Sequence, residues 1–368
     1  MKRRDRFFKR IDWYIIGKFL GTYFFSLALI LAIAVVFDFN EHVDKFVQNE
    51  APMKAIILDY YLNFVPYFGV LFSPLFVFIS VIFFTSKLAE NSEIIAMSST
   101  GISMHRLMRP YMFSALFIAI ITFVLGSYVI PRGNVTRLEF ENKYKKQKIV
   151  ETGHNLQLKV EDGVIAYFGR FERANSTGYR FSLDKFEGNA MKSHFTAKTL
   201  AYVGDDANPN LWVAKNWQLR TITDTLEVIT SGEKMDTTLA ILPYDLLVSE
   251  NQQETMTSPE LKRYIERQRK RGFANMKAFE VEYHNRIATS FAAFILTLIG
   301  VSLSSKKVKG GMGMNLGVGI GLSFAYILFQ TVSSTFAINR NMPPIMAVWM
   351  PNIVFLIIGI FLYKKAPK

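Results

Sequence analysis

The sequence predicts an α-helical membrane protein with six transmembrane helices and an all-β domain inserted between the third and fourth helices. Three observations predict this fold class. Half of the 368 residues are apolar and only 20% are charged, whereas soluble domains are about a quarter charged. The apolar residues gather in long runs that contain no charge, and a long central segment alternates between apolar and polar residues instead.

Each transmembrane helix is predicted by one charge-free run, because roughly 20 helical residues at about 1.5 Å each cross the hydrocarbon layer of a bilayer. The runs are residues 19–37, 60–86, 110–131, 287–305, 310–339 and 341–363. Buried helices of a large soluble protein are the alternative interpretation, but their apolar runs rarely exceed about 18 residues.

The distribution of Lys and Arg predicts the orientation. Six spans place both termini on one side of the membrane. The N-terminal arm, the loops at 87–109 and 306–309 and the C-terminal tail are rich in basic residues, whereas the short opposite loops hold only Lys45, Lys54 and Arg340. Both termini are therefore predicted to be cytoplasmic. Basic segments next to anionic lipid heads account for the net charge of +13 without a nucleic-acid partner.

The segment 132–286 between spans three and four is predicted to be a β-domain. Glu161-Asp162-Gly163 is a strong hairpin signal, and Ser231-Gly232 is predicted to be a second turn. Seven or eight short strands of this kind indicate a sandwich or a jelly roll. The expected strands are 155–160, 164–171, 178–186, 195–203, 211–222, 226–230 and 235–241. Residues 139–148 are expected to extend the third span outward, and a helix is expected to start at Pro259.

Several kinds of chemistry are excluded by what the sequence lacks. With no cysteine, the chain has no disulfide, no thiolate metal site and no cysteine nucleophile. It contains neither a phosphate-binding loop nor a His-Glu-x-x-His motif. We therefore predict no catalytic residue, no metal, no cofactor and no ATP site in this chain. The glycine-rich stretch 310–321 opens a span and is expected to serve close helix packing.

The loop between spans two and three contains a short predicted helix. Asn91 or Ser92 can cap its start, and Gly101 can end it. Its acidic start and its Met and Ile side chains suit a groove on a soluble partner. A plain connector between two spans is an equal alternative from the residues alone.

Several pieces of sequence, in this order, carry a family resemblance: Ser92-Glu-Ile-Ile-Ala-Met97 with Thr100-Gly-Ile-Ser103, Trp212-Val-Ala-Lys-Asn-Trp-Gln-Leu-Arg220, Glu282-Tyr-His-Asn-Arg-Ile-Ala288 with Leu298-Ile-Gly300, the run 310–321, and Trp349-Met-Pro-Asn352. With them, the chain resembles the lipopolysaccharide export permeases (LptF/LptG, also YjgP/YjgQ) over essentially its whole length.

The resemblance implies a function and partners. It implies the permease subunit of an ABC transporter that extracts lipopolysaccharide from the inner membrane and passes it through an all-β periplasmic jelly-roll-like domain to a periplasmic bridge protein. The expected partners are a cytoplasmic ABC ATPase dimer and a second permease subunit of the same family. The implied domains are residues 1–131, 132–284 and 285–368, with the coupling helix near 90–100.

The resemblance also implies site residues. The coupling helix of the family matches Ser92, Glu93, Ile94, Met97 and Ser98, with Glu93 at the acidic position that would contact basic residues of the ATPase. Lipid phosphates are expected near positive side chains at the outer end of span one. That stretch, 38–45, is more acidic here than the family pattern, so the expected cations are Lys45 and, behind it, Arg286 and Arg340, although Arg340 also suits an interfacial anchor. An apolar path for acyl chains is expected in the β-domain, at Phe168, Phe181, Phe195 and Trp212.

Two other functions stay open at this point. A permease of another ABC exporter, for lipoprotein release or peptide export, would share the missing ATP site and the coupling helix. It typically carries its outer domain after the first span, which the layout of three spans on each side of the β-domain disfavours. A membrane scaffold without transport would need no coupling helix, and co-purification of a small ATPase would separate it from both transporters.

Overall fold

The computed structural model describes residues 9–145, 152–172, 174–188, 190–204, 208–223, 226–246, 252–270, 276–306, 311–339 and 342–366. They form two compact units, which we describe separately. The membrane unit contains the described residues of Met1–Lys145, Gln253–Leu261 and Lys277–Lys368. The sheet unit contains those of Lys146–Gln252 and Lys262–Met276.

The described residues contain six helical segments that are long and apolar enough to cross a membrane, which confirms the predicted number of spans. They run over Arg10–Gln48, Met53–Glu90, Met104–Tyr144, Lys277–Ser304, Met312–Ile338 and Pro344–Lys365. In order, the elements are α1 (Arg10–Gln48), α2 (Met53–Ala55), the π-helical turn η1 (Ile56–Tyr61), α3 (Leu62–Glu90), α4 (Glu93–Ser99), α5 (Met104–Val124), the π-helical turn η2 (Leu125–Val129), α6 (Ile130–Tyr144), α9 (Lys277–Ser304), α10 (Gly311–Asn339) and α11 (Pro344–Lys365).

Helix α9 packs closely against its neighbours through a small residue. A Cβ atom on Gly300 would lie 2.7 Å from Val81 Cγ1 of α3, so only glycine allows this approach. In the glycine-rich start of α10, Gly319 plays the same part, because its Cβ would lie 2.1 Å from Ile82 Cδ1. Gly313, Gly317 and Gly321 face open space within this chain. Within the described part of this chain, the predicted close packing is therefore found at Gly319 and not at these three.

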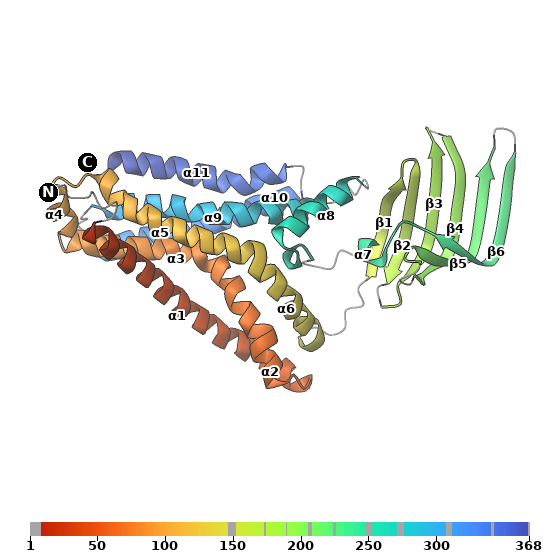
Figure 1. The fold of residues 1–368 in the computed structure, drawn as a ribbon, viewed down its shortest axis with the longest axis horizontal. Coiled ribbons are helices and arrows are strands. Elements are labelled where there is room, and N and C mark those ends of the chain that lie inside the picture. The colour runs from red at the N-terminus through yellow and green to blue at the C-terminus, as the bar shows by residue number, and fades with distance from the viewer. Residues whose placement is uncertain are drawn as a thin grey trace, which may run out of the picture. The chain divides into compact units, whose positions relative to one another are not determined.

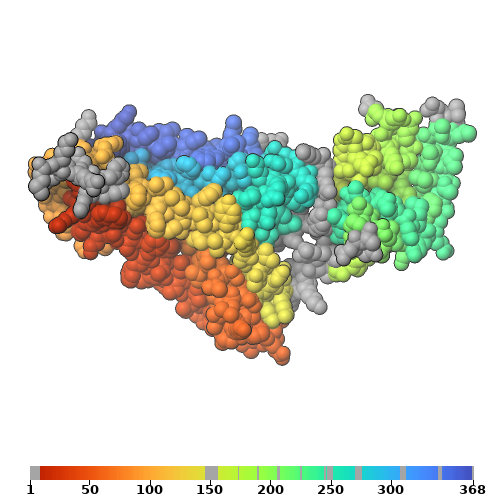
Figure 2. All heavy atoms as spheres, in the orientation of Figure 1, coloured from red at the N-terminus to blue at the C-terminus, as the bar shows by residue number. Residues whose placement is uncertain are grey.

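Helix α1 is the least covered of the spans. Only 17% of its most apolar stretch is buried, compared with 67% for α9. Figures 1 and 2 show α1 along the lower edge of the membrane unit, and in Figure 1 its C-terminal end lies beside α2. Polar contacts of Asp12, Tyr23 and Asp38 join α1 to other elements. One of them is the hydrogen bond between the Tyr23 and Ser73 hydroxyls at 2.8 Å.

The sheet unit holds one antiparallel sheet with its strands in sequence order (Figure 1). The strands are β1 (Thr152–Glu161), β2 (Val164–Glu172), β3 (Thr177–Glu187), β4 (Ala190–Tyr202), β5 (Leu211–Ile222) and β6 (Glu227–Thr238). The hairpin turn at Gly163 is confirmed, since Gly163 has a φ of +77° between β1 and β2. Two short helices and a helical turn follow the sheet in the chain: α7 (Pro243–Leu246), the 3-10 turn η3 (Gln252–Thr255) and α8 (Ser258–Lys270). The expected helix at Pro259 is confirmed by α8.

The predicted turn at Ser231-Gly232 is wrong. Strand β6 runs straight through it, with Ser231 paired to Gln218 and Gly232 paired to Trp217 of β5. A Cβ atom on Gly232 would lie 2.9 Å from the indole nitrogen of Trp217. This glycine therefore makes room for the Trp217 side chain on the neighbouring strand. The two predicted strands 226–230 and 235–241 are joined in the single strand β6.

The sheet turns a corner along a line that crosses its strands. One opposed pair is missing from each ladder between β2 and β6, at Gly169, Arg180, Lys198, Asn216 and Glu233, and the register is the same on both sides of this line. Arg180 and Asn216 have left-handed φ values of +53° and +51°. Across this line the buried residues follow a step of three, as in Phe168 and Phe171, instead of the step of two of a regular strand. The apolar face therefore continues on both wings of the bent sheet.

Candidate functional site

The coupling helix expected from the sequence is α4, between α3 and α5 (Figure 1). It lies at the end of the membrane unit that also holds the beginning of α1 and the end of α11. Ser92 precedes it in the left-handed region, at φ 62°, and its side chain makes no capping bond. Gly101 follows it at φ +83° and donates its N–H to the Ser98 carbonyl at 3.0 Å. Both ends of α4 are therefore sharply turned.

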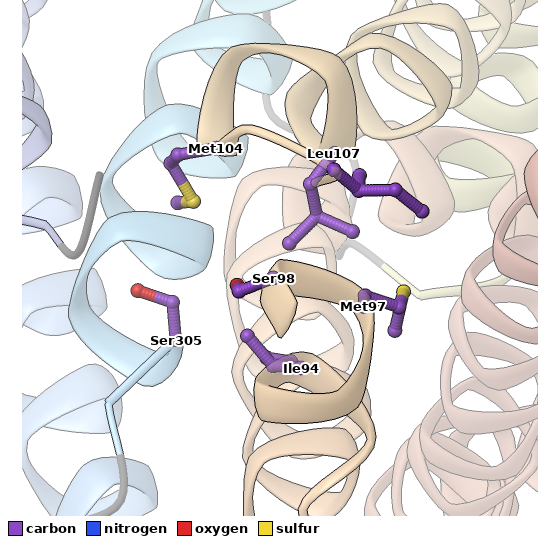
Figure 3. Close-up of a pocket in the computed structure, with 7 residues that line it drawn as sticks. Ile94, Met97, Ser98, Met104, Leu107 and Ser305 are labelled. Carbon is purple, nitrogen blue, oxygen red and sulfur yellow. The ribbon is translucent and has the colours of Figure 1, made fainter. Parts of the chain in front are cut away.

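The inner side of α4 is apolar and packs against its own chain. Ile94 and Met97 are buried in the core of the membrane unit. Together with Ser98, they line a small cavity with side chains from the start of α5 and the end of α9 (Figure 3). The other lining residues are Ile102, Met104, Leu107 and Ser305. Ile94 and Met97 thus hold α4 in place and do not form a surface for a soluble partner.

The outer side of α4 carries different residues. Ile95 is 56% exposed, and Ala96 and Ser99 are exposed beside it. Glu93 is half-buried at the first turn, where its carboxylate accepts a hydrogen bond from the Asn91 amide at 3.2 Å. The sequence analysis missed Ile95, although helical spacing places it opposite the Ile94 and Met97 face.

A second group of polar residues surrounds Arg286 in α9. This guanidinium is buried and donates to the carbonyls of Gln253 and Met256 at 3.1 and 2.8 Å. It also contacts Glu282 at 2.8 Å and the Ser258 hydroxyl at 3.3 Å. Its donors therefore bind the segment 253–258, and this geometry favours a positioning role for Arg286 over contact with a lipid phosphate.

The same segment is held from α6 by Arg137. The Asn134 amide donates to the Glu254 carbonyl at 3.2 Å, and the Arg137 guanidinium lies 3.7 Å from the Glu254 carboxylate. Burial, together with the nearby Glu282 charge, raises the pKa of Glu254 to about 7, although Arg137 and Arg286 act to lower it. At 3.7 Å the attraction of Arg137 does not offset the burial of the carboxylate.

Glu254→Gln is expected to remove a pH dependence from this segment. Because the pKa is raised from 4.5 to about 7, the folded chain holds a proton that the unfolded chain releases. The resulting stabilisation is complete below pH 4.5 and is lost as the pH rises through 7. Its full size is on the order of 3 kcal/mol. Hydrogen exchange of amides 253–258, corrected for intrinsic rates, is expected to speed up between pH 5 and 8 in the natural protein and to stay level in the variant. Equal slopes in both proteins would contradict the assignment.

The C-terminal end of α1 carries a third polar group, centred on Asp38. Its carboxylate accepts hydrogen bonds from the hydroxyls of Tyr60 and Tyr61 at 3.0 and 3.1 Å, both from η1. The Lys145 ammonium, at the end of α6, lies 3.4 Å away. Burial lowers the pKa of Lys145, and Asp38 opposes this. Asp38 thus has a structural role, because it joins α1 to η1 and to the end of α6.

The remaining candidate cations differ in their surroundings. Lys45 is exposed in the last turn of α1 and is therefore accessible to an anionic ligand. Arg340 lies outside the described residues. Of the predicted phosphate contacts, Lys45 is the one whose placement suits the role best.

The four predicted aromatic residues of the sheet come together in one apolar cluster on the inner face. Phe168 and Phe181 have ring centroids 4.8 Å apart, and Phe168 and Trp212 have centroids 6.2 Å apart. Phe195 follows 6.2 Å from Phe181. The indole of Trp212 donates to the carbonyl of Ile241 at 3.0 Å. All four are buried, so the inner face of the bent sheet is apolar as expected.

Comparison with known proteins shows which family of sequences this chain resembles. A sequence profile described as "Lipopolysaccharide export system permease LptF/LptG" matches residues 13–365. The chain is 22% identical over 307 residues to the lipopolysaccharide export system permease protein LptF of Escherichia coli strain K12, which covers 81% of this chain and 79% of that protein. It is also 27% identical over 205 residues to an uncharacterized protein of Aquifex aeolicus, which covers 53% of this chain and 55% of the other. The match thus spans about half the length of the Aquifex protein.

Proposed function

The chain belongs to the LptF/LptG family of lipopolysaccharide export system permeases, and we propose that it is the permease subunit of an ABC transporter that extracts lipopolysaccharide from the inner membrane and passes it to a periplasmic protein bridge. The observation that carries this proposal is the family match over residues 13–365, which includes both the membrane spans and the sheet. Members of this family are permease subunits and not enzymes.

The chain is a multi-pass protein of the inner membrane. We place both termini and α4 in the cytoplasm. The excess of Lys and Arg in the terminal segments and in the loop 87–109 supports this orientation. With this orientation the sheet unit lies in the periplasm, as a jelly-roll-like domain. The bent six-stranded sheet supports that assignment, because it presents one apolar inner face across both of its wings.

The energy for lipopolysaccharide extraction would come from a cytoplasmic ABC ATPase dimer, because the sequence holds no phosphate-binding loop of its own. We propose that the ATPase docks on the outer side of α4, with Glu93 facing basic residues and Ile95 supplying the apolar contact. Ser92 and Ser98 lie at the margins of this surface, and Ile94 and Met97 support it from below. A second permease of the same family would complete the transporter beside the exposed faces of α1 and α10, of which only 17% and 22% are buried.

Acyl chains need an apolar path from the bilayer to the bridge, since exposing them to water costs about 0.8 kcal/mol for each methylene. We propose that Lys45 meets the lipid phosphates at the outer end of α1. Phe168, Phe181, Phe195 and Trp212 would line the upper path, which opens when the wings of the sheet separate. The proposed domain boundaries stay at 1–131, 132–284 and 285–368.

Purification of the chain from its native membrane tests this function. The expected result is a complex with a small ATPase and a second permease, with lipopolysaccharide identified in it by mass spectrometry. A photo-crosslinking residue at Phe195 is expected to trap lipopolysaccharide in the presence of ATP, and the same residue at the exposed outward position Lys215 serves as the control. A complex that lacks the ATPase, or equal crosslinking at both positions, would contradict the proposal.

A further inference from the structure

A partly buried ion pair joins the beginning of α1 to the segment that follows α4. Asp12 lies in the first turn of α1 and is only 1% exposed. Its carboxylate accepts the backbone N–H of Lys9 at 2.7 Å and contacts the Arg106 guanidinium at 2.5 Å. An acidic residue suits a helix start, where the helix dipole is positive. Arg106 sits at the start of α5, where the helix dipole disfavours a cation, and Asp12 supplies the compensating negative charge.

The connection from α4 to Arg106 is short and hydrogen-bonded throughout. The N–H of Ile102 donates to the Met97 carbonyl at 3.1 Å, and Gly101 donates to Ser98 at 3.0 Å. The N–H of Arg106 donates to the Ser103 hydroxyl at 3.3 Å, which caps α5. A displacement of α4 therefore reaches Arg106 without a flexible segment in between.

The apolar contacts in this region do not fix the direction in which α1 moves with α4, whereas the ion pair does. Ile15 and Phe19 of α1 belong to the same core as Ile94 and Leu107, but apolar surfaces can slide past one another. The charge-assisted bond between Asp12 and Arg106 has a defined geometry. Because so little of α1 is buried, its position depends strongly on such bonds.

We infer that the ion pair between Asp12 and Arg106 is the link through which a displacement of α4 moves the beginning of α1. Asp12 and Arg106 are then positioning residues for the coupling of ATP hydrolysis to lipid release. The inference rests on the coupling role of α4 proposed above, and it adds the route by which the motion leaves α4.

The test uses the full complex in proteoliposomes and measures lipopolysaccharide released per ATP hydrolysed. Asp12→Asn and Arg106→Gln are each expected to lower this ratio at least about fivefold, the lower end of typical coupling between sites. The double variant is expected to lower it no further, because one break already disconnects the link. Arg109→Gln removes a charge from an exposed position one turn along α5 and is expected to leave the ratio unchanged. A purely structural role would reduce the amount of complex but not the ratio.

A second measurement is independent of transport. Since the chain has no cysteine, spin labels at Arg10→Cys and Ser99→Cys report one distance between α1 and α4. Arg106→Gln is expected to broaden that distance distribution, and an unchanged width would overturn the inference, as would an unchanged ratio in both single variants. If Glu93→Lys also left transport intact, the coupling role of α4 itself would fall. If Glu93→Lys alone stopped transport, only the link would fall.

Discussion

Replacing Glu93 with lysine is expected to abolish lipopolysaccharide release while the protein still inserts into the membrane. Glu93 is half-buried at the start of α4, and its carboxylate accepts a hydrogen bond from Asn91. A lysine at a helix start costs only about 0.3–1 kcal/mol, which does not unfold a helix anchored by Ile94 and Met97. When this lysine faces basic residues of an ATPase, however, the repulsion between like charges costs several kcal/mol of binding free energy. We therefore expect a loss of at least about a hundredfold, at 1.4 kcal/mol for each tenfold step.

The measurement is lipopolysaccharide release and ATPase activity in proteoliposomes. Glu93→Gln should weaken coupling less, because it removes the attraction without adding repulsion. Glu90→Lys makes the same charge change near the end of α3 and is the control. Normal release by the Glu93→Lys protein would remove the coupling role of α4.

Replacing Arg286 with methionine is expected to destabilise the segment 253–258 by about 3–5 kcal/mol, as typically happens when one partner of a buried ion pair is removed. The change leaves Glu282 and the carbonyls of Gln253 and Met256 without their donor. Arg286→Lys keeps the charge but cannot reproduce the fork of bonds, so an intermediate loss is expected.

The destabilised segment is expected to unfold locally more often. Hydrogen exchange of the amides 253–258 and limited proteolysis measure this local unfolding directly. Arg132→Met removes an exposed arginine from α6 and should change stability by no more than about 0.5 kcal/mol. Protection of the segment at the natural level in Arg286→Met would mean that the bonds to Arg286 do not hold it.

The spans could be predicted from the sequence because a charge-free run of membrane length has few other structures open to it. The hairpin at Gly163 could be predicted because its backbone conformation is encoded by two adjacent residues. Gly232 shows the limit of this reasoning. Its role is set by Trp217 on the neighbouring strand, which no local pattern reveals.

The candidate site was predictable in position but not in orientation. The sequence places a short helix at 93–99, but only tertiary packing decides that Ile94 and Met97 face inward and Ile95 faces out. The partners of Arg286 and of Asp12 are likewise set by contacts far apart in the chain. Arg286 was interpreted from the sequence as a cation near lipid phosphates, and the structure gives it several bonds within the membrane unit.

The corner in the sheet has a mechanical consequence. Every strand from β2 to β6 continues across the corner, so both wings share the same hydrogen-bonded ladders. If the wings separate to admit acyl chains, as proposed above, the backbone would flex along this irregular line and the pairing within each wing would stay intact. Such an opening would change a few backbone angles without breaking a row of hydrogen bonds, so it could be repeated without unfolding the sheet.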